Sequence, residues 1–272
     1  MTQEEIRQFL EFYKDLGMKT IFKRGSALDA PEALPDLVED LNSLLPPMVS
    51  APAARAVPVR VMPPPAPIMK TTVPKLLPLV PEGDSMEAIR QDIGDCKRCR
   101  LCEARNKIVF GSGSEGARLV FVGEGPGADE DASGLPFVGR AGQLLTAMID
   151  GTASKEGITI LRPDVYITNV VKCRPPENRA PMPDEMEICG QFLFRQLLAI
   201  KPKAICALGS TAAKALLGTK EGVTKLRGNW HNWQDIPVMV TYHPSYLLRP
   251  YNQNAKRESW EDLKKVLHFV YD

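Results

Sequence analysis

From Ser85 onward, short apolar runs alternate with stretches of helical pattern, and this alternation constrains the fold more than any other feature of the chain. The apolar runs are continuous, which is typical of strands that are buried on both faces of a parallel sheet. The sequence therefore predicts an α/β fold, a three-layer sandwich with a central parallel sheet flanked by helices. The expected strands are residues 119–122, 165–168, 204–208 and 236–242, and the expected helices are 139–150, 183–200, 258–271 and one capped by Ser210.

The N-terminal part has a different composition. Residues 2–16 predict a short amphipathic helix, in which Thr2 and Glu5 form a capping box. Residues 46–82 hold eleven of the 24 prolines, and such a stretch stays extended and solvated. We expect three parts: a helix or tail at 1–25, a disordered Pro/Ala-rich linker at 26–82 and a folded domain at 83–272. The N-terminal helix either packs on the domain or docks a protein partner.

Charge and hydropathy exclude few partners. The net charge is +1, so any basic footprint for a polyanion has to be local. No apolar run is long enough to span a membrane, and the N-terminus does not resemble a signal peptide. We therefore expect a cytoplasmic monomer with no membrane association.

Cysteine spacing indicates a metal centre. In a reducing compartment, clustered cysteines hold metal more often than they form disulfides. An iron–sulfur cluster needs a close pair and two later thiolates, and zinc is the main rival for such a set. Cys102 extends the close pair and competes as a ligand, whereas Cys206 lies in an expected strand and is interpreted as a buried apolar residue. The candidate ligands are Cys96, Cys99, Cys173 and Cys189.

Three motifs follow expected strands, and the carboxyl ends of parallel strands meet at one edge of a sheet, where ligands bind. The first is the glycine turn 123–127, which either lets a ligand approach the backbone or is only a tight strand-to-helix turn. The second is Asn169, whose amide offers a donor and an acceptor and suits a pyrimidine edge. The third is His243, which is either structural or part of the same rim as the other two motifs.

Two further features lie beside these motifs. Phe137 stands between turn residues, so its ring is either a core plug or a stacking surface for a flat ligand. Lys172, Arg174 and Arg179 form a local basic patch that suits phosphates, or else a solvated surface loop.

Together these motifs resemble the family 4 uracil-DNA glycosylases, the iron–sulfur branch of that superfamily. The resemblance covers roughly 85–272 and none of 1–84. It implies that 83–272 is a uracil-DNA glycosylase-like catalytic domain, that a 4Fe–4S cluster is bound by Cys96, Cys99, Cys173 and Cys189, and that Cys102 is a bystander. The matching stretches are 96–101, 123–127, 134–145, 168–179 and 243–249.

The resemblance also implies roles in removing uracil from DNA after the base is flipped out of the stack. Phe137 would stack on the uracil, while Asn169 would accept from N3–H and donate to O4. His243 would hydrogen-bond O2 as the N-glycosidic bond breaks. Gly123 and Gly127 would let the base approach the backbone. Ser245 and Arg249 belong to a loop whose residues 246–249 would wedge into the duplex and grip phosphates.

The catalytic water has no obvious holder in this sequence. The best-known branch of the superfamily has an Asp where this chain has Gly125, so Glu124, Glu130 or backbone carbonyls of the turn would position the water. Residues 177–184 contain no His, which argues against the branch that links itself covalently to uracil-DNA.

The chemistry implied is monofunctional hydrolysis that initiates base excision repair. A lyase needs an amine that forms a Schiff base, and the only lysine in the three motifs, Lys172, is interpreted as a phosphate contact beside Cys173. Two alternatives remain open at this point: a non-catalytic iron–sulfur module that binds DNA or a protein partner, and an electron carrier.

Overall fold

The computed structural model describes residues 83–272. The expected helix at 2–16, the tail at 1–25 and the linker at 26–82 lie outside the described residues, so these predictions remain untested.

A six-stranded sheet forms the centre of the described domain, with the strand order β1-β3-β2-β4-β6-β5. The four inner strands are parallel, as expected, and each outer strand is antiparallel to its neighbour. The α/β sandwich is therefore confirmed, but its sheet is mixed. The strands are β1 (Ser112–Gly113), β2 (Leu119–Gly123), β3 (Tyr166–Asn169), β4 (Ala204–Leu208), β5 (Trp230–Trp233) and β6 (Ile236–Thr241).

The two outer strands are the ones that the sequence analysis missed. β1 has two residues, which is too short for a hydrophobic pattern. β5 joins β6 through Gln234 and Asp235, and both residues have positive φ (48° and 65°), as in a tight hairpin turn.

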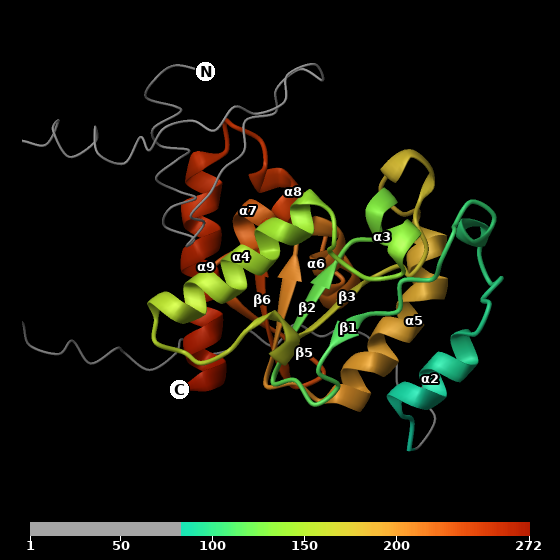
Figure 1. Cartoon of the computed structure of the whole chain (residues 1–272), viewed down its shortest axis with the longest axis horizontal. Helices are drawn as coiled ribbons and strands as arrows, with labels where there is room; N and C mark the ends of the chain where they lie inside the picture. Colours follow the sequence, from blue (N-terminus) through green and yellow to red (C-terminus); the bar gives the residue numbers. More distant parts are fainter. Residues whose placement is uncertain (1–82) are drawn as a thin grey trace, which may run out of the picture. The chain divides into compact units, whose positions relative to one another are not determined.

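Helices cover both faces of the sheet, with α4 and α9 on one side and α2 and α5 on the other (Figure 1). Along β2, side chains alternate between the two cores: Val120 and Val122 pack toward α5, whereas Leu119 and Phe121 pack toward α4 and α9. The helices are α2 (Met86–Ile93), α3 (Ala128–Ser133), α4 (Arg140–Lys155), α5 (Pro183–Ile200), α6 (Ser210–Leu217), α7 (Val223–Leu226), α8 (Pro244–Leu247) and α9 (Gln253–Tyr271).

The start of α6 differs from the expectation in a way that matters for the site. Ser210 is the first helical residue, and Gly209 is the N-cap. Gly209 has a φ of 92°, and a Cβ there would lie 3.0 Å from the Cβ of His243. Glycine therefore allows the end of β4 to pass close to the loop that follows β6.

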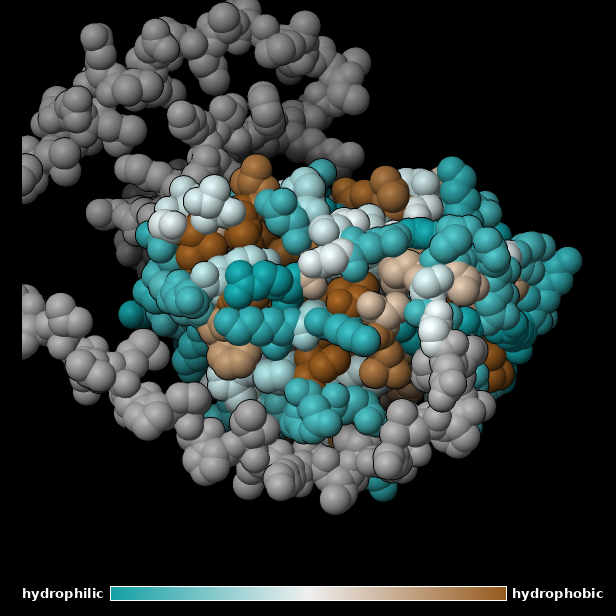
Figure 2. Space-filling model, turned by 90° about the horizontal axis from the view of Figure 1, so that it is seen from below, coloured by the Kyte–Doolittle hydropathy of each residue, from teal (hydrophilic) through white to brown (hydrophobic). Residues whose placement is uncertain are grey.

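The surface shows no single apolar face in the view of Figure 2, where hydrophobic residues form separate patches among hydrophilic ones. No helix within residues 83–272 combines the length and the apolar content that crossing a membrane requires.

The two-sided core predicts how a cavity mutation behaves. Leu145 of α4 is 1% exposed, so Leu145→Ala should lower the free energy of unfolding by about 2–5 kcal/mol. Leu161→Ala is the matched control, because Leu161 is 57% exposed and its truncation should change stability by no more than about 0.5 kcal/mol. Urea unfolding followed by circular dichroism measures both, and equal effects would contradict this description of the core.

Candidate active site at the carboxyl ends of the strands

A pocket of about 330 Å³ opens at the carboxyl ends of the parallel strands. The segments that line this pocket follow β2, β3, β4 and β6, whose last residues lie side by side in the sheet. The structure thus brings three distant motifs to one rim. The expected site residues that line it are Glu124, Gly125, Gly127, Glu130, Phe137, Asn169, His243 and Ser245.

Two expected residues do not line the pocket. Gly123 lies directly beneath it, because a Cβ there would come within 2.4 Å of Asn169 Oδ1 and 2.6 Å of the Phe137 ring. Arg249 is exposed beyond α8, where it donates to the Tyr251 hydroxyl at 3.3 Å. The sequence analysis gave no pocket role to the Leu208–Ser210 turn, which lines the pocket because α6 starts at the end of β4.

Asn169 is the last residue of β3 and pairs with Gly123 of β2. Its side chain is buried, with 1% exposure, and its Oδ1 has no hydrogen-bond partner within residues 83–272. An unpaired buried acceptor costs about 1–3 kcal/mol, so native proteins rarely leave one without a reason. The pocket therefore contains an acceptor that a ligand N–H can satisfy.

Phe137 forms one wall of the pocket in a strained backbone conformation. Its φ is 52°, which is unusual for an aromatic residue. Arg162 holds the backbone around it by donating to the carbonyls of Pro136 at 2.8 Å and Gly142 at 3.2 Å. The ring is buried, so any flat ligand that contacts it has to enter the pocket.

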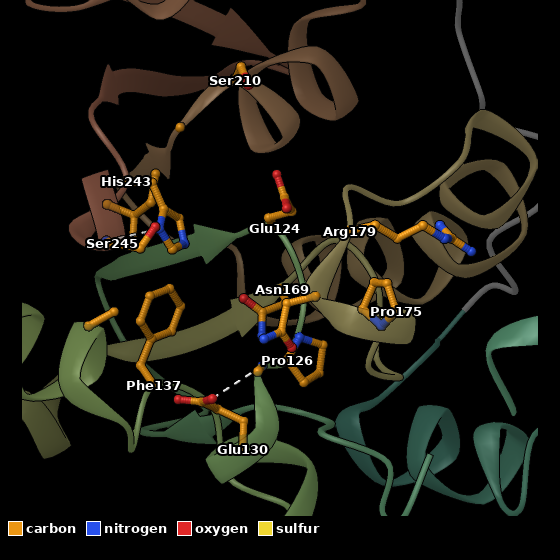
Figure 3. A pocket seen from close by; sticks show the side chains of 16 residues that line it. Glu124, Pro126, Glu130, Phe137, Asn169, Pro175, Arg179, Ser210, His243 and Ser245 are labelled. Carbon is orange, nitrogen blue, oxygen red and sulfur yellow. Dashed lines mark hydrogen bonds between the residues drawn. The ribbon is translucent and has the colours of Figure 1, made fainter. Parts of the chain in front are cut away.

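His243 lies opposite, with its ring centroid 5.6 Å from that of Phe137. Its Nδ1 accepts from the backbone N–H of Ser245 at 3.2 Å, so a neutral ring carries its proton on Nε2. Burial lowers the pKa of His243 to about 4. The side chain is thus a neutral donor at physiological pH. Figure 3 shows Phe137, Asn169 and His243 facing a common space.

The two candidate carboxylates differ in their partners. Glu130 accepts from the backbone N–H groups of Gly127 at 3.1 Å, Val138 at 2.9 Å and Gly139 at 3.0 Å. Its carboxylate therefore holds the glycine turn to the start of α4 (Figure 3). Glu124 accepts from the Thr211 hydroxyl of α6 and lines the pocket.

Gly125 lies where a side chain does not fit. A Cβ there would come within 2.8 Å of Val171 Cγ2, so an Asp at this position would require the neighbouring strand end to shift.

Of the three residues in the expected basic patch, Lys172 is buried whereas Arg174 and Arg179 are partly exposed, which corrects the interpretation of Lys172 as a phosphate contact. Lys172 has 0% exposure, and its Nζ donates to Thr168 Oγ1 at 2.6 Å, Asn169 O at 2.8 Å and Gln196 Oε1 at 2.7 Å. Burial lowers its pKa to about 7. Arg179 lines the pocket, and its guanidinium donates to the buried carboxylate of Glu185 at 2.7 and 2.9 Å (Figure 3).

The four candidate metal ligands adjoin one core. Burial raises the pKa of Cys173 to about 11 and that of Cys189 to about 12. Two N–H groups point at these sulfurs: the backbone N–H of Lys172 donates to Cys189 Sγ at 3.2 Å, and Arg105 Nη1 donates to Cys173 Sγ at 3.5 Å. The four are Cys96, Cys99, Cys173 and Cys189, all unoxidised.

The four thiols supply the kind of donor that an iron–sulfur cluster needs, but within residues 83–272 they are not grouped as a formed metal site. Four thiols and N–H groups directed at sulfur are typical of such sites. Cys206 lies inside β4 in the opposite core, which confirms its interpretation as a buried apolar residue. As they stand, no three His, Cys, Asp or Glu side chains within residues 83–272 form a group that could hold a metal ion.

Comparison with known proteins identifies the class. The model of the uracil DNA glycosylase superfamily matches residues 110–264. A Type-4 uracil-DNA glycosylase from Thermotoga maritima is 46% identical over 187 residues, which cover 68% of this chain and 94% of the relative. The chain therefore belongs to the uracil DNA glycosylase superfamily.

Further relatives specify the branch. Type-4 uracil-DNA glycosylases from Sulfurisphaera tokodaii and Archaeoglobus fulgidus are 43% and 41% identical over 191 residues, or 67% of this chain, and the matches cover 84% and 92% of the relatives. Within the superfamily, this chain is a member of the type-4 family.

The two shifted histidine pKa values predict opposite effects of pH on stability. The pKa of His243 is lowered by burial from 6.5 to about 4, so between these values an unfolded chain binds a proton that the folded chain does not. Stability should therefore fall from pH 6.5 to 4, and His243→Gln should reduce that fall.

His268 is the matched control. Hydrogen bonds to Glu156 and Asp272 raise its pKa above 6.5, so its contribution is present below pH 6.5 and is lost as the pH rises through the folded value. His268→Gln should therefore steepen the loss of stability toward low pH. The measurement is urea unfolding at several pH values, and changes of the same sign in both variants would contradict the assignment.

Proposed function

We propose that this protein excises uracil from DNA by hydrolysing the N-glycosidic bond and leaves an intact abasic strand. The observation that carries the proposal is the unpaired Asn169 Oδ1, which lies beside the Phe137 ring in a pocket of about 330 Å³. Uracil presents an N3–H donor between two carbonyl acceptors, so it supplies the hydrogen atom that this acceptor lacks. Relatives that are named Type-4 uracil-DNA glycosylases support the same activity.

Base selection follows from the amide. Asn169 accepts from uracil N3–H and donates to O4, while Phe137 stacks on the ring. Cytosine reverses both groups on its edge, with an acceptor at N3 and a donor at the exocyclic amine, so it would leave the buried amide mismatched. Mismatched buried polar groups are a strong source of discrimination.

His243 stabilises the leaving group. As the glycosidic bond breaks, negative charge develops on the uracil, and the Nε2–H of a neutral imidazole donates to O2. The Ser245 N–H at Nδ1 fixes that proton on Nε2 before the substrate arrives. Losing one preorganised donor to a developing anion costs about 3–4 kcal/mol, so His243→Ala should slow excision by at least about 100-fold.

Glu124 is the better candidate for holding the water. Glu130 already accepts from three backbone N–H groups, whereas within residues 83–272 Glu124 accepts only from the Thr211 hydroxyl. The turn at Gly125 places the Glu124 carboxylate at the pocket wall. Gly125 itself, where a Cβ would be crowded, carries no side chain.

The loop at α8 is suited to contacting the DNA backbone. Ser245, Tyr246 and Arg249 are exposed, so these side chains can reach the duplex. Leu247 is fully buried and is part of the core, so it does not serve as a wedge.

Cys96, Cys99, Cys173 and Cys189 would hold a 4Fe–4S cluster. When bound, the cluster would cross-link the segment before β1 to the β3–α5 connection and to α5, which is a structural function. The buried thiols, with their raised pKa values, would be deprotonated by the metal, and the N–H groups of Lys172 and Arg105 would stabilise the sulfur charge.

Base recognition is tested most simply at Asn169. Asn169→Ala should abolish most uracil release from a defined oligonucleotide while leaving binding to abasic-site DNA nearly unchanged, because the product has no base to read. Asn169→Asp removes the donor to O4 and should shift discrimination weakly toward cytosine. Near-normal turnover by Asn169→Ala would show that this amide does not read the base.

The cluster assignment predicts iron in the purified protein. We expect broad visible absorbance and about four irons per chain. Cys99→Ala should lose iron and solubility, whereas Cys102→Ala and Cys206→Ala should keep both. Stoichiometric zinc without iron after anaerobic expression would contradict the assignment.

The last expectation is that the protein hydrolyses the N-glycosidic bond without a lyase step that would cut the strand. Among the residues that the structure describes, no lysine lines the pocket and Lys172 turns its Nζ into the core, so none of these amines is placed to form a Schiff base. Uracil release should leave alkali-labile but unbroken strands. Borohydride trapping of a protein–DNA adduct, or strand cleavage without alkali, would overturn this reading.

A further inference from the structure

Lys172 is a buried lysine for which the proposed chemistry has no use. Its side chain has 0% exposure, and lysine is almost never buried unless its polar atoms are paired. It does not line the pocket and cannot touch DNA. The burial of Lys172 is therefore explained by the groups to which its Nζ donates hydrogen bonds.

The Nζ of Lys172 lies within hydrogen-bond distance of three oxygen atoms. Two belong to the end of β3, the Thr168 hydroxyl at 2.6 Å and the Asn169 carbonyl at 2.8 Å. The third is Gln196 Oε1 of α5 at 2.7 Å. The Lys172 side chain thus joins the last two residues of β3 to α5, the helix that packs on this face of the sheet.

The hydrogen-bond network extends from Lys172 to the backbone carbonyl of Phe110. Gln196 Nε2 donates to the carbonyl of Phe110 at 3.0 Å, and Thr168 Oγ1 donates to the same carbonyl at 3.1 Å. Phe110 is buried in the core that α5 shares with the sheet. The Lys172 Nζ is therefore part of a connected set of buried hydrogen bonds, which are rigid when every member is paired.

Asn169 is held between this network and β2. On the β2 side, the backbone N–H of Val170 donates to Gly123 O at 3.0 Å. On the α5 side, Lys172 Nζ is the hydrogen-bond donor to the Asn169 carbonyl. Fixing the backbone on both sides sets the direction in which the Asn169 amide leaves the strand.

We propose that Lys172 is a positioning residue for base recognition: it fixes the end of β3 so that the Asn169 amide meets the edge of the flipped pyrimidine. The inference rests on the proposed role of Asn169 in reading uracil. Lys172 also donates its backbone N–H to Cys189 Sγ, and the next residue is Cys173. The segment 169–173 therefore connects the base-reading amide to two of the candidate cluster ligands, one in the segment and one through this hydrogen bond.

A double-mutant cycle on the full-length, iron-loaded protein tests this. Lys172→Met keeps the length of the side chain and removes its donors. Because Lys172→Met removes the donor that fixes the Asn169 carbonyl, it should slow single-turnover uracil release by about 10-fold or more. In the Asn169→Ala background the same substitution should slow release by less than about 2-fold, because no amide remains to be positioned.

His243→Ala is the matched control background. His243 contacts the base from another strand, so Lys172→Met should keep its full effect there. Binding to abasic-site DNA and the visible absorbance should change little in Lys172→Met, because neither depends on the base-reading amide. Thr168→Val, which removes one acceptor of the Nζ with little change of shape, should give a smaller effect with the same dependence on Asn169.

Two results would overturn the proposal, and they are distinguishable. If Lys172→Met and Thr168→Val slow release by the same factor whether or not Asn169 is present, Lys172 supports the fold in general and does not position the amide. If Asn169→Ala alone releases uracil at a near-normal rate, the proposed role of Asn169 fails and the inference fails with it.

Discussion

Parallel pairing of β2 with β3, and of β4 with β6, is the interaction on which the site depends. The register places Gly123 opposite Asn169 and Leu208 opposite Thr241, so the chain leaves all four strands at one edge of the sheet. Motifs that are more than 100 residues apart in sequence then share one pocket. A change of register by one residue would turn Asn169 to the opposite face of the sheet and remove the amide from the pocket.

Buried polar groups fix the loops that follow these strands. Glu130 fixes the glycine turn, and Asp131 of the same helix accepts from the backbone N–H of Asn106 at 2.9 Å, which ties the segment after the cysteine pair to α3. Glu185 accepts from Arg179 and from the Met182 N–H at 2.7 Å at the start of α5. Each carboxylate joins segments that lack regular strand pairing. The loops are therefore held by specific hydrogen bonds, and the pocket keeps its shape without a ligand.

The sequence predicted the inner sheet because its strands are continuous apolar runs with turn signals at their ends. It also predicted that Asn169 and His243 would lie near each other, since both follow such strands. It missed β1 and β5, because two residues give no pattern and a Trp-His-Asn-Trp strand at an edge alternates only weakly. The type-4 family was recognised from motifs in order, which the comparisons confirm.

Burial of charge was the least predictable feature. Lys172 lies two residues before Arg174, at the start of a loop rich in proline, and composition alone suggested a phosphate contact. Its acceptors come partly from Gln196, which is 24 residues away and approaches only once α5 packs on the sheet. The sequence also could not separate Glu124 from Glu130 as the holder of the water. The backbone N–H groups that donate to Glu130 come from the turn before α4, eight and nine residues further along, and they approach it only in the folded chain.

The central claim is that the space between Phe137, Asn169 and His243 is a uracil pocket, and a crystal structure of the protein with free uracil tests it most directly. The account predicts a uracil ring stacked on Phe137, with N3 about 3 Å from Asn169 Oδ1 and O2 about 3 Å from His243 Nε2. Uracil bound elsewhere, or bound in the pocket with Asn169 Oδ1 still unpaired, would contradict it.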